Sequence, residues 1–408
     1  MTYFGVLKST KSSLIYILAS CLLIELVYIG AVYTIHYSRR ENKQALCLQN
    51  TKSDRYQCWQ DAIESALKTK GVDAALDEVA YFHDLQPEFA NDCHAFVHIV
   101  GNEAYRLYAE HKDFALTTKV TYCAYGFFHG FLETLIQSGG TFAEARSFCK
   151  YAAGKLSTLY QAEDSCYHGV GHGVTDGSDP RAWGNPQAII APGLDSCAKI
   201  APGSEQLKSC ATGVFNSLAI MTIAGENRLV PDTANPYGLC AKQEKPEYRR
   251  ACYEQMNTLA MHVVDNQFER AIPLVFLIAD KTEQKVALSS LAAAAASGSL
   301  LQPQENDKKV AETCHQFAHM YSVDCIRGLL GGLMEHGKPG SEYVRAYAFC
   351  TLPLLTADEK NACLNYFMIY ARSLYDFAKM QDVCRLDKSA WGTRCMEYAL
   401  ATFPKTAK

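Results

Sequence analysis

Paired cysteines are the feature that most limits how this chain can fold. The 408-residue sequence has 17 cysteines, and setting Cys21 aside leaves an even set of 16. An even set of spaced cysteines, without the CxxC spacing of zinc ribbons and redox motifs, is typical of a disulfide framework formed in an oxidising compartment. Connectivity cannot be proved from sequence, and sequential pairing is the prediction. The expected pairs are Cys47–Cys58, Cys93–Cys123, Cys149–Cys166, Cys197–Cys210, Cys240–Cys252, Cys314–Cys325, Cys350–Cys363 and Cys384–Cys395.

A repeated frame begins at the second cysteine of several pairs. The best examples read CAYGFFHGFLE from Cys123, CYHGVGHGVTD from Cys166, CATGVFNSLAI from Cys210 and CIRGLLGGLME from Cys325. From Cys123 through Cys252 the spacing of these cysteines is 43, 44 and 42 residues. A period of about 40 residues is that of a two-helix unit in an α-solenoid or α/α toroid.

Local patterns also favour helices. The stretches LNYFMIYARSLYDFAK (364–379) and AFVHIVGNEAYRLYAE (95–110) repeat apolar residues at intervals of three and four. The segment TADEK (356–360) has a threonine cap followed by acidic residues, a helix start. The predicted fold is therefore all-α, built of disulfide-stapled helical hairpins. In each hairpin we expect one helix to end at the first cysteine, a turn of 10–16 residues, and the next helix to start near the second.

The HG-x-G-like helix starts, as in the CYHGVGHGVTD repeat, are similar to those of the α/α toroid of lanthionine-synthetase-like proteins. The similarity covers a few residues in each repeat. The paired cysteines and the apolar N-terminal segment depart from that family, so no functional residue is transferred from it.

The N-terminal segment predicts a membrane anchor. Residues 14–37 form an apolar stretch of 24 residues whose one formal charge is Glu25, long enough to span a bilayer as a helix. An uncleaved signal anchor would leave residues 1–13 in the cytoplasm and the disulfide-bonded remainder in the periplasm or extracellular space. An alternative is the lipoprotein-like box LASC (18–21), which would make Cys21 lipidated, although the apolar stretch continues past it.

The remainder is expected to have two halves. DCHAFVH (92–98) resembles TCHQFAH (313–319), and each precedes a glycine-rich cysteine repeat. The predicted parts are an extracytoplasmic helical-repeat half at 38–280, an Ala-rich helix or linker at 281–310, and a second helical-repeat half at 311–408. The net charge of −4 argues against nucleic acid as a partner, since phosphate contacts need a basic face. The expected partners are the membrane, through the N-terminal helix, and a protein.

A cluster of histidines and carboxylates is the candidate chemical site. In a helix, side chains four residues apart share a face and can chelate one metal ion. Three successive motifs contain such pairs, and adjacent repeats could bring them together around one Zn ion, or two Fe or Mn ions. A haem held by two of the histidines is a further option, although no CxxCH motif is present. The candidate ligands are His94, His98, His129, Glu133, His168, His172 and Asp176.

A purely structural interpretation competes with the metal site. Buried histidines commonly hydrogen-bond a neighbouring carbonyl, and glycines four residues apart let helices approach closely. However, the repeat at Cys210 keeps Gly213 but has Asn216 in place of histidine, and the repeat at Cys325 has Gly331 there. Because the frame persists without histidine, packing alone does not require it. A sparser second candidate comprises His315, His319, Glu335 and His336.

Two functions are consistent with these patterns. The first is a membrane-anchored extracytoplasmic helical-repeat protein with a His/carboxylate metal site, whose catalytic status the sequence leaves open. The alternative is a non-enzymatic cell-envelope scaffold that binds a protein partner through its repeat surface. The sequence contains no GxSxG elbow, Walker loop or dinucleotide fingerprint that would name a reaction.

Overall fold

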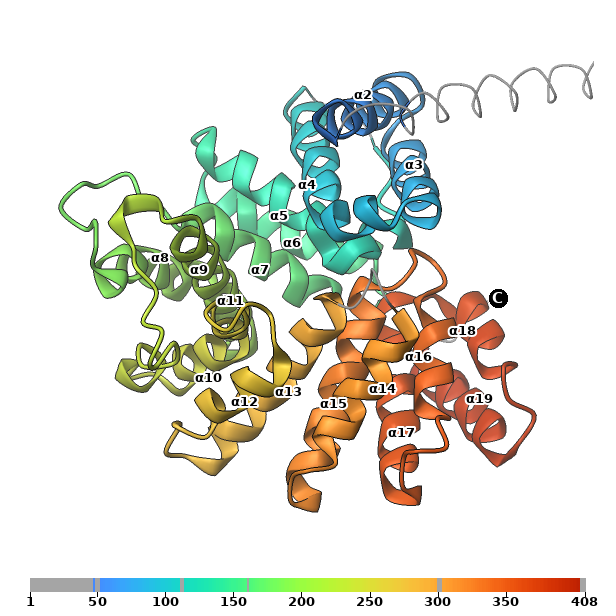
Figure 1. The fold of residues 1–408 in the computed structure, drawn as a ribbon. Helices are drawn as coiled ribbons and strands as arrows, with labels where there is room; N and C mark the ends of the chain where they lie inside the picture. The colour runs from blue at the N-terminus through green and yellow to red at the C-terminus, as the bar shows by residue number, and fades with distance from the viewer. Residues whose placement is uncertain (1–46, 48–51, 111–113, 160, 299–302, 404–408) are drawn as a thin grey trace, which may run out of the picture. The chain divides into compact units, whose positions relative to one another are not determined.

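The described part of the chain is all-helical, which confirms the predicted fold class. A computed structural model describes residues 47, 52–110, 114–159, 161–298 and 303–403, and none of them forms a strand. The chain divides into two compact units, and the second, Ile63–Lys408, contains the candidate site. The helices (Figure 1) are α2 Lys52–Lys70, α3 Val72–Leu85, α4 Pro87–Ala109, η1 Thr118–Thr121, α5 Tyr122–Gln137, α6 Phe142–Lys155, α7 Ala162–Val174, α8 Pro186–Ile200, α9 Ser204–Ala224, η2 Glu226–Arg228, η3 Cys240–Lys242, α10 Pro246–Gln255, α11 Asn257–His262, α12 Phe268–Val275, α13 Lys281–Gly298, α14 Pro303–Cys314, α15 His319–His336, α16 Glu342–Cys350, α17 Ala357–Leu374, α18 Phe377–Cys384 and α19 Ala390–Thr402.

Local sequence explains where several helices begin. The Thr356 side chain accepts the Glu359 backbone N–H, while the Glu359 carboxylate accepts the Thr356 N–H. This capping box starts α17 at the TADEK segment, as predicted. Thr141 and Glu144 form the same reciprocal pair at the start of α6. Such caps satisfy backbone donors that have no partner within the helix.

Alternate helices of this unit lie side by side in succession. Within it, α4 contacts α5, α5 contacts α7, and α7 contacts α9 (Figure 1). Farther along, α9 contacts α10, and α13, α15 and α17 follow as neighbours. The later helices also return to the earlier ones: α15 contacts α5, and the Tyr125 hydroxyl donates to the Ser373 carbonyl oxygen at 2.6 Å. The Ala-rich stretch forms α13, which packs against α15.

Glycine makes these helix contacts unusually close. A Cβ added to Gly126 on α5 would lie 2.8 Å from the His94 carbonyl oxygen on α4. At the α7–α9 crossing, a Cβ on Gly171 would lie 2.8 Å from the Gly213 Cα, and one on Gly213 would lie 2.9 Å from the Gly171 Cα. Real Cβ atoms almost never approach other atoms so closely. The glycines of the repeat frame therefore let the backbones of neighbouring helices touch.

Disulfides are present, as predicted from the cysteine spacing. Eight disulfides join described residues, all in the predicted sequential pairs, with Cα atoms 5.2–5.8 Å apart. The expected hairpin geometry is only partly right. Helices α14, α16 and α18 do end at the first cysteine of a pair, but the second cysteine lies inside the next helix. Cys363, for example, is the seventh residue of α17, so the interhelix turns are shorter than 10–16 residues.

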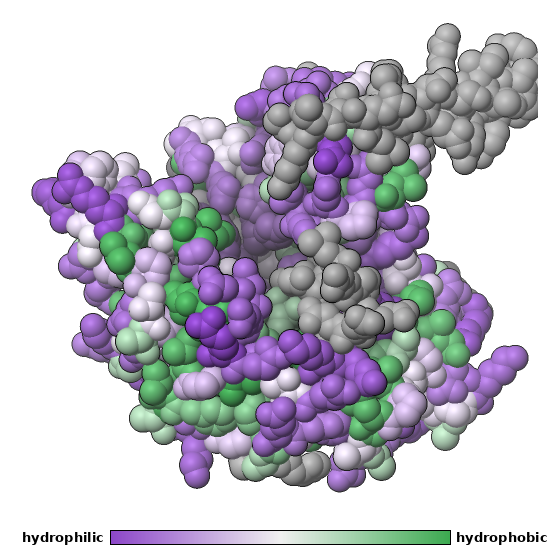
Figure 2. All heavy atoms as spheres, in the orientation of Figure 1, coloured by the Kyte–Doolittle hydropathy of each residue, from purple (hydrophilic) through white to green (hydrophobic). Residues whose placement is uncertain are grey.

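The predicted membrane segment, residues 14–37, lies outside the described residues, as do Cys21 and the short segment before the anchor. Within the described residues, one helix, α9 (Ser204–Ala224), has the length and apolar composition needed to cross a membrane. More than half of its most apolar part is buried, and it packs against α7, α8 and α10, as a core helix does. Figure 2 shows one face of the molecule, on which hydrophilic side chains surround smaller hydrophobic patches.

Candidate metal centre

Three neighbouring helices carry the histidine cluster. His94 and His98 lie on α4, His129 and Glu133 on α5, and the remaining two histidines on α7. The close α4–α5 contact at Gly126 and the α5–α7 contact at Gly169 bring these helices together; a Cβ on Gly169 would lie 2.5 Å from the Phe128 carbonyl oxygen. The cluster can form because glycine has no side chain to hold these helices apart.

Three nitrogens form a compact triangle that could hold a metal ion. His94 Nε2 lies 3.0 Å from His98 Nε2, and His129 Nδ1 lies 3.1 Å from both. An ion about 2.05 Å from each nitrogen, the usual zinc–imidazole distance, would see them at angles of about 95–100°. That arrangement caps one side of an ion and leaves the other side open. His129 is only 5% exposed, whereas the two α4 histidines are half-buried, so the triangle borders solvent.

Acceptor groups lie on the outer side of the His94 and His98 rings, away from the triangle. His94 Nδ1 lies 2.7 Å from the Cys123 carbonyl oxygen, and a carbonyl can only accept, so Nδ1 carries the hydrogen. His98 Nδ1 lies 3.7 Å from Glu133 Oε2. The Nε2 of His94 therefore presents its lone pair to the triangle, and the nearby carboxylate favours the same tautomer for His98. A histidine whose second nitrogen donates to a carbonyl or carboxylate is the usual arrangement around bound metals.

An unusual turn aims that carbonyl. Cys123, Ala124 and Tyr125 have φ values of 52°, 58° and 59°, so the chain enters α5 through a left-handed turn. Each such non-glycine residue costs about 1–2 kcal/mol. The disulfide to Cys93 and the Tyr125–Ser373 hydrogen bond hold the turn in place. Strained backbone of this kind is concentrated at functional sites.

A second group of nitrogens adjoins the first. His129, His168 and His172 also offer ligand atoms within 4.8 Å of one another. The two α7 residues face each other with their Nε2 atoms 3.2 Å apart. Their ring centres lie 4.6 and 4.4 Å from that of His129, which thus belongs to both groups.

Glu133 lies behind the ligands rather than among them. Its carboxylate oxygens face His98 Nδ1 at 3.7 Å and His172 Nδ1 at 3.3 Å, on the sides of these rings away from their Nε2 atoms. Burial alone would raise the pKa of Glu133, but the hydrogen bonds from His172 and His98 outweigh it and lower the pKa to about 2. Glu133 is thus an ionised acceptor that orients two rings, and the sequence prediction of a direct ligand is not supported by this geometry.

Burial favours the neutral form of four of the histidines. It lowers the pKa of His94 to about 3 and holds the pKa of His129 and of His168 well below the usual value, with neighbouring imidazoles adding to the effect. Burial also lowers the pKa of His172, although Glu133 opposes the shift. Neutral imidazole is the form that binds metal, because a proton and a metal compete for one lone pair.

Asp176 does not join the cluster. Helix α7 ends at Val174, so Asp176 lies beyond the face that carries His172 and is exposed. Its carboxylate accepts from the Ser178 backbone N–H and the Ser178 hydroxyl, both at 2.8 Å. The spacing of four residues between His172 and Asp176 predicted a ligand only if α7 continued through Asp176.

The sparser second candidate does not assemble among the described side chains. His315 Nε2 pairs with Glu359 Oε2 at 3.0 Å, a partner outside the proposed set. His336 lies beside His83, and burial lowers the pKa of both to about 4. The side chain of His319 lies outside the described residues. Burial raises the pKa of Glu335 to about 7, and it belongs to neither histidine group.

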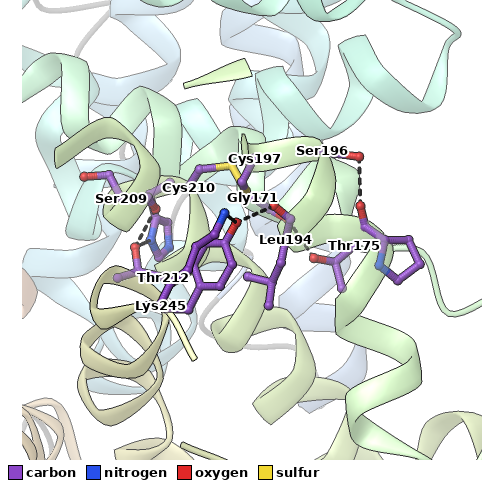
Figure 3. Close-up of a disulfide and its surroundings, with 12 residues drawn as sticks. Gly171, Thr175, Leu194, Ser196, Cys197, Ser209, Cys210, Thr212 and Lys245 are labelled. Carbon is purple, nitrogen blue, oxygen red and sulfur yellow. Dashed lines mark hydrogen bonds between the residues drawn. A yellow bond between two sulfur atoms is a disulfide. The ribbon is translucent and has the colours of Figure 1, made fainter. Parts of the chain in front are cut away.

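Sequence reasoning missed the outer partners from α9. Thr212 Oγ1 lies 2.7 Å from His168 Nδ1, and Ser217 Oγ lies 3.1 Å from His172 Nδ1. Thr212 follows the Cys197–Cys210 disulfide by two residues and lies close to Ser209 (Figure 3). Both residues belong to the repeat at Cys210, which has no histidine. A hydroxyl that supports a ligand has no spacing signature of its own, so only the fold shows it.

The donor set limits the chemistry. Both groups consist of imidazoles alone, which suit Zn²⁺ or Fe²⁺ better than Mn²⁺, an ion that prefers carboxylate and water ligands. A haem does not fit the triangle, because its axial nitrogens lie on opposite faces of the macrocycle, about 4 Å apart. An ion held by three imidazoles with an open side could bind and polarise a fourth ligand such as water.

Comparison with protein-family models, with curated proteins and with solved structures found no match to this chain.

Proposed function

We propose that this chain is a membrane-anchored, extracytoplasmic helical-repeat protein that binds a divalent metal ion at His94, His98 and His129. The observation that carries the proposal is the triangle of ring nitrogens 3.0–3.1 Å apart. A hydrogen on one of these nitrogens can point to only one acceptor at a time, whereas a metal ion accepts lone pairs from all three nitrogens at once.

The open side of the triangle gives the ion a possible task. With three protein ligands, a zinc-like ion keeps a position for water or substrate and lowers the pKa of a bound water. Metal-assisted hydrolysis is the reaction class that an ion held by this donor set would supply best. The role of this chain's residues is to hold the ion, through the three imidazoles, and to orient His94 through the Cys123 carbonyl.

The repeat arrangement and the location belong to the same proposal. The succession of neighbouring helices and the return contact between α15 and α5 are what a closed array of hairpins requires. Eight disulfides support an oxidising compartment, since such bonds are rare in the cytosol. A C-terminal alkaline phosphatase fusion, active only outside the cytoplasm, tests the orientation. A fusion that is inactive while a cytoplasmic reporter works would contradict it.

Elemental analysis of the purified full-length chain tests the metal site. The wild type is expected to contain a divalent transition metal, and His94→Ala or His129→Ala is expected to contain at least one equivalent less. His262→Ala is the matched control, because His262 is exposed at the end of α11 and belongs to neither histidine group. Equal metal content in the wild type and the cluster variants would refute the proposal.

A further inference from the structure

We propose that the cluster binds two metal ions, the second between the facing Nε2 atoms of His168 and His172, with His129 shared between the two positions. This inference rests on the proposed function, because it assumes that the first triangle is itself a metal site. It adds a second site from a different helix, α7, and from supporting residues on α9.

The hydrogen of His168 is fixed by Thr212. The Thr212 hydroxyl donates to the Ser209 carbonyl oxygen at 2.6 Å. A hydroxyl has a single hydrogen, so toward His168 Nδ1, 2.7 Å away, Thr212 Oγ1 can only accept. Nδ1 of His168 therefore carries the hydrogen, and its Nε2 has a free lone pair.

Two oxygens flank Nδ1 of His172: Ser217 Oγ at 3.1 Å and Glu133 Oε1 at 3.3 Å. The ionised carboxylate can only accept, so it favours the tautomer of His172 with the hydrogen on Nδ1. In that tautomer the Nε2 of His172 also has a free lone pair. Residues from two flanking helices, α5 and α9, thus turn both lone pairs toward the same point.

The separation of the two Nε2 atoms suits a metal ion. They lie 3.2 Å apart, and His172 is 7% exposed. Two imidazoles four residues apart on one helix can chelate a metal, and 3.2 Å is the separation expected for two nitrogens about 2.05 Å from one ion at a near-tetrahedral angle. With the hydrogens of both rings on Nδ1, an ion between the Nε2 atoms would accept both lone pairs, which would otherwise face each other.

His129 links the two positions. Its Nδ1 faces the first triangle, and its ring centre lies within 4.6 Å of the ring centres of His168 and His172. A neutral imidazole has one free lone pair, so to serve two ions His129 must release its N–H proton to solvent and bridge them as an imidazolate, one ion on each nitrogen. The proposal therefore assigns His94 and His98 to the first ion, His168 and His172 to the second, and His129 to both.

Metal stoichiometry of the purified full-length chain tests this inference. The chain is stripped with a chelator and titrated with Zn²⁺, and in parallel with Co²⁺, whose visible absorption reports imidazole ligation. The wild type is expected to bind two equivalents, His168→Ala one, and His94→Ala one. Thr212→Val keeps the side-chain volume and is expected to weaken only the second equivalent, by about tenfold to a hundredfold. Circular dichroism melting of each variant checks that it is folded.

The outcomes separate the two proposals. One equivalent in the wild type, unchanged in folded His168→Ala and Thr212→Val, would overturn the second site and leave the first intact. No binding in the wild type would overturn both. If the wild type binds two equivalents and folded Thr212→Val binds none, the inference is also contradicted, because Thr212 supports only His168.

Discussion

Replacing Gly130 by alanine should remove the metal site by pushing two helices apart. A Cβ at Gly130 on α5 would lie 2.8 Å from the His98 carbonyl carbon and still closer to its oxygen, both on α4, where ordinary contacts are 3.4–4 Å. The backbone cannot yield as a flexible side chain can. The two helices must therefore separate locally by roughly 1 Å or more, a typical overpacking response.

The size of that shift decides the effect on metal binding. Two nitrogens of the triangle belong to α4, and the third, His129 Nδ1, precedes Gly130 directly on α5. A separation of about 1 Å moves His129 Nδ1 from 3.1 Å to about 4 Å from its partners. One ion with bonds of 2.0–2.1 Å could then reach it only along a straight line between nitrogens. We expect Gly130→Ala to lower the metal affinity at least a hundredfold and to cost about 1–3 kcal/mol of stability.

The assay is competition with a chromogenic chelator, combined with urea unfolding. Gly154→Ala is the matched control: Gly154 is also inside a helix, α6, and a Cβ there would meet nothing within 4 Å. This control should keep the wild-type affinity and gain up to about 1 kcal/mol of stability from the helix preference of alanine. If Gly130→Ala folds and binds metal like the wild type, close backbone approach is not what assembles the site.

Three further predictions concern the outer residues, the buried acids and the disulfides. Glu133→Gln removes the charge behind two ligands and should weaken metal binding about tenfold to a hundredfold, measured by the same competition; an unchanged affinity would contradict its orienting role. Burial raises the pKa of Glu342 to about 7 in the fold, although the Tyr375 hydroxyl donates to it. The free energy of unfolding should therefore be highest below the unfolded pKa of about 4.5 and should fall by about 3 kcal/mol as the pH rises through 7, where the buried carboxyl loses its proton. Glu342→Gln should flatten the pH profile of urea unfolding, and an unaltered slope would refute this. Replacing Cys149 and Cys166 together by serine removes a disulfide that spans 17 residues and should lower the free energy of unfolding by about 3 kcal/mol, measured by thermal melting. A wild type that melts at the same temperature after reduction would contradict this.

The histidine pairs could be predicted from sequence because helical spacing is a local property. His94 with His98, and His168 with His172, share a helix face wherever the helix lies. Their meeting with His129 was expected only if neighbouring repeats turned the same face inward, which the glycine contacts between α4, α5 and α7 bring about. The membrane anchor at residues 14–37 stays a prediction.

Other parts could not be predicted, for physical reasons. Asp176 looked like a ligand because the spacing continued, but the helix stopped two residues earlier, at Val174. The second cysteines were expected at helix starts, yet Cα separations of 5.2–5.8 Å suit helices already packed side by side. Thr212 supports His168 across a sequence distance of 44 residues, and nothing in the residue type reveals such a role.

The Cys93–Cys123 disulfide lies next to the candidate ligand His94 at both of its ends. Cys93 precedes His94 in the chain, and the Cys123 carbonyl is the group that orients the His94 ring. Formation of this disulfide therefore also restrains the carbonyl group that orients the His94 ring. A chain in which this bond is reduced lacks the restraint that orients the His94 ring, so metal binding at the first triangle should depend on oxidation of the Cys93–Cys123 pair.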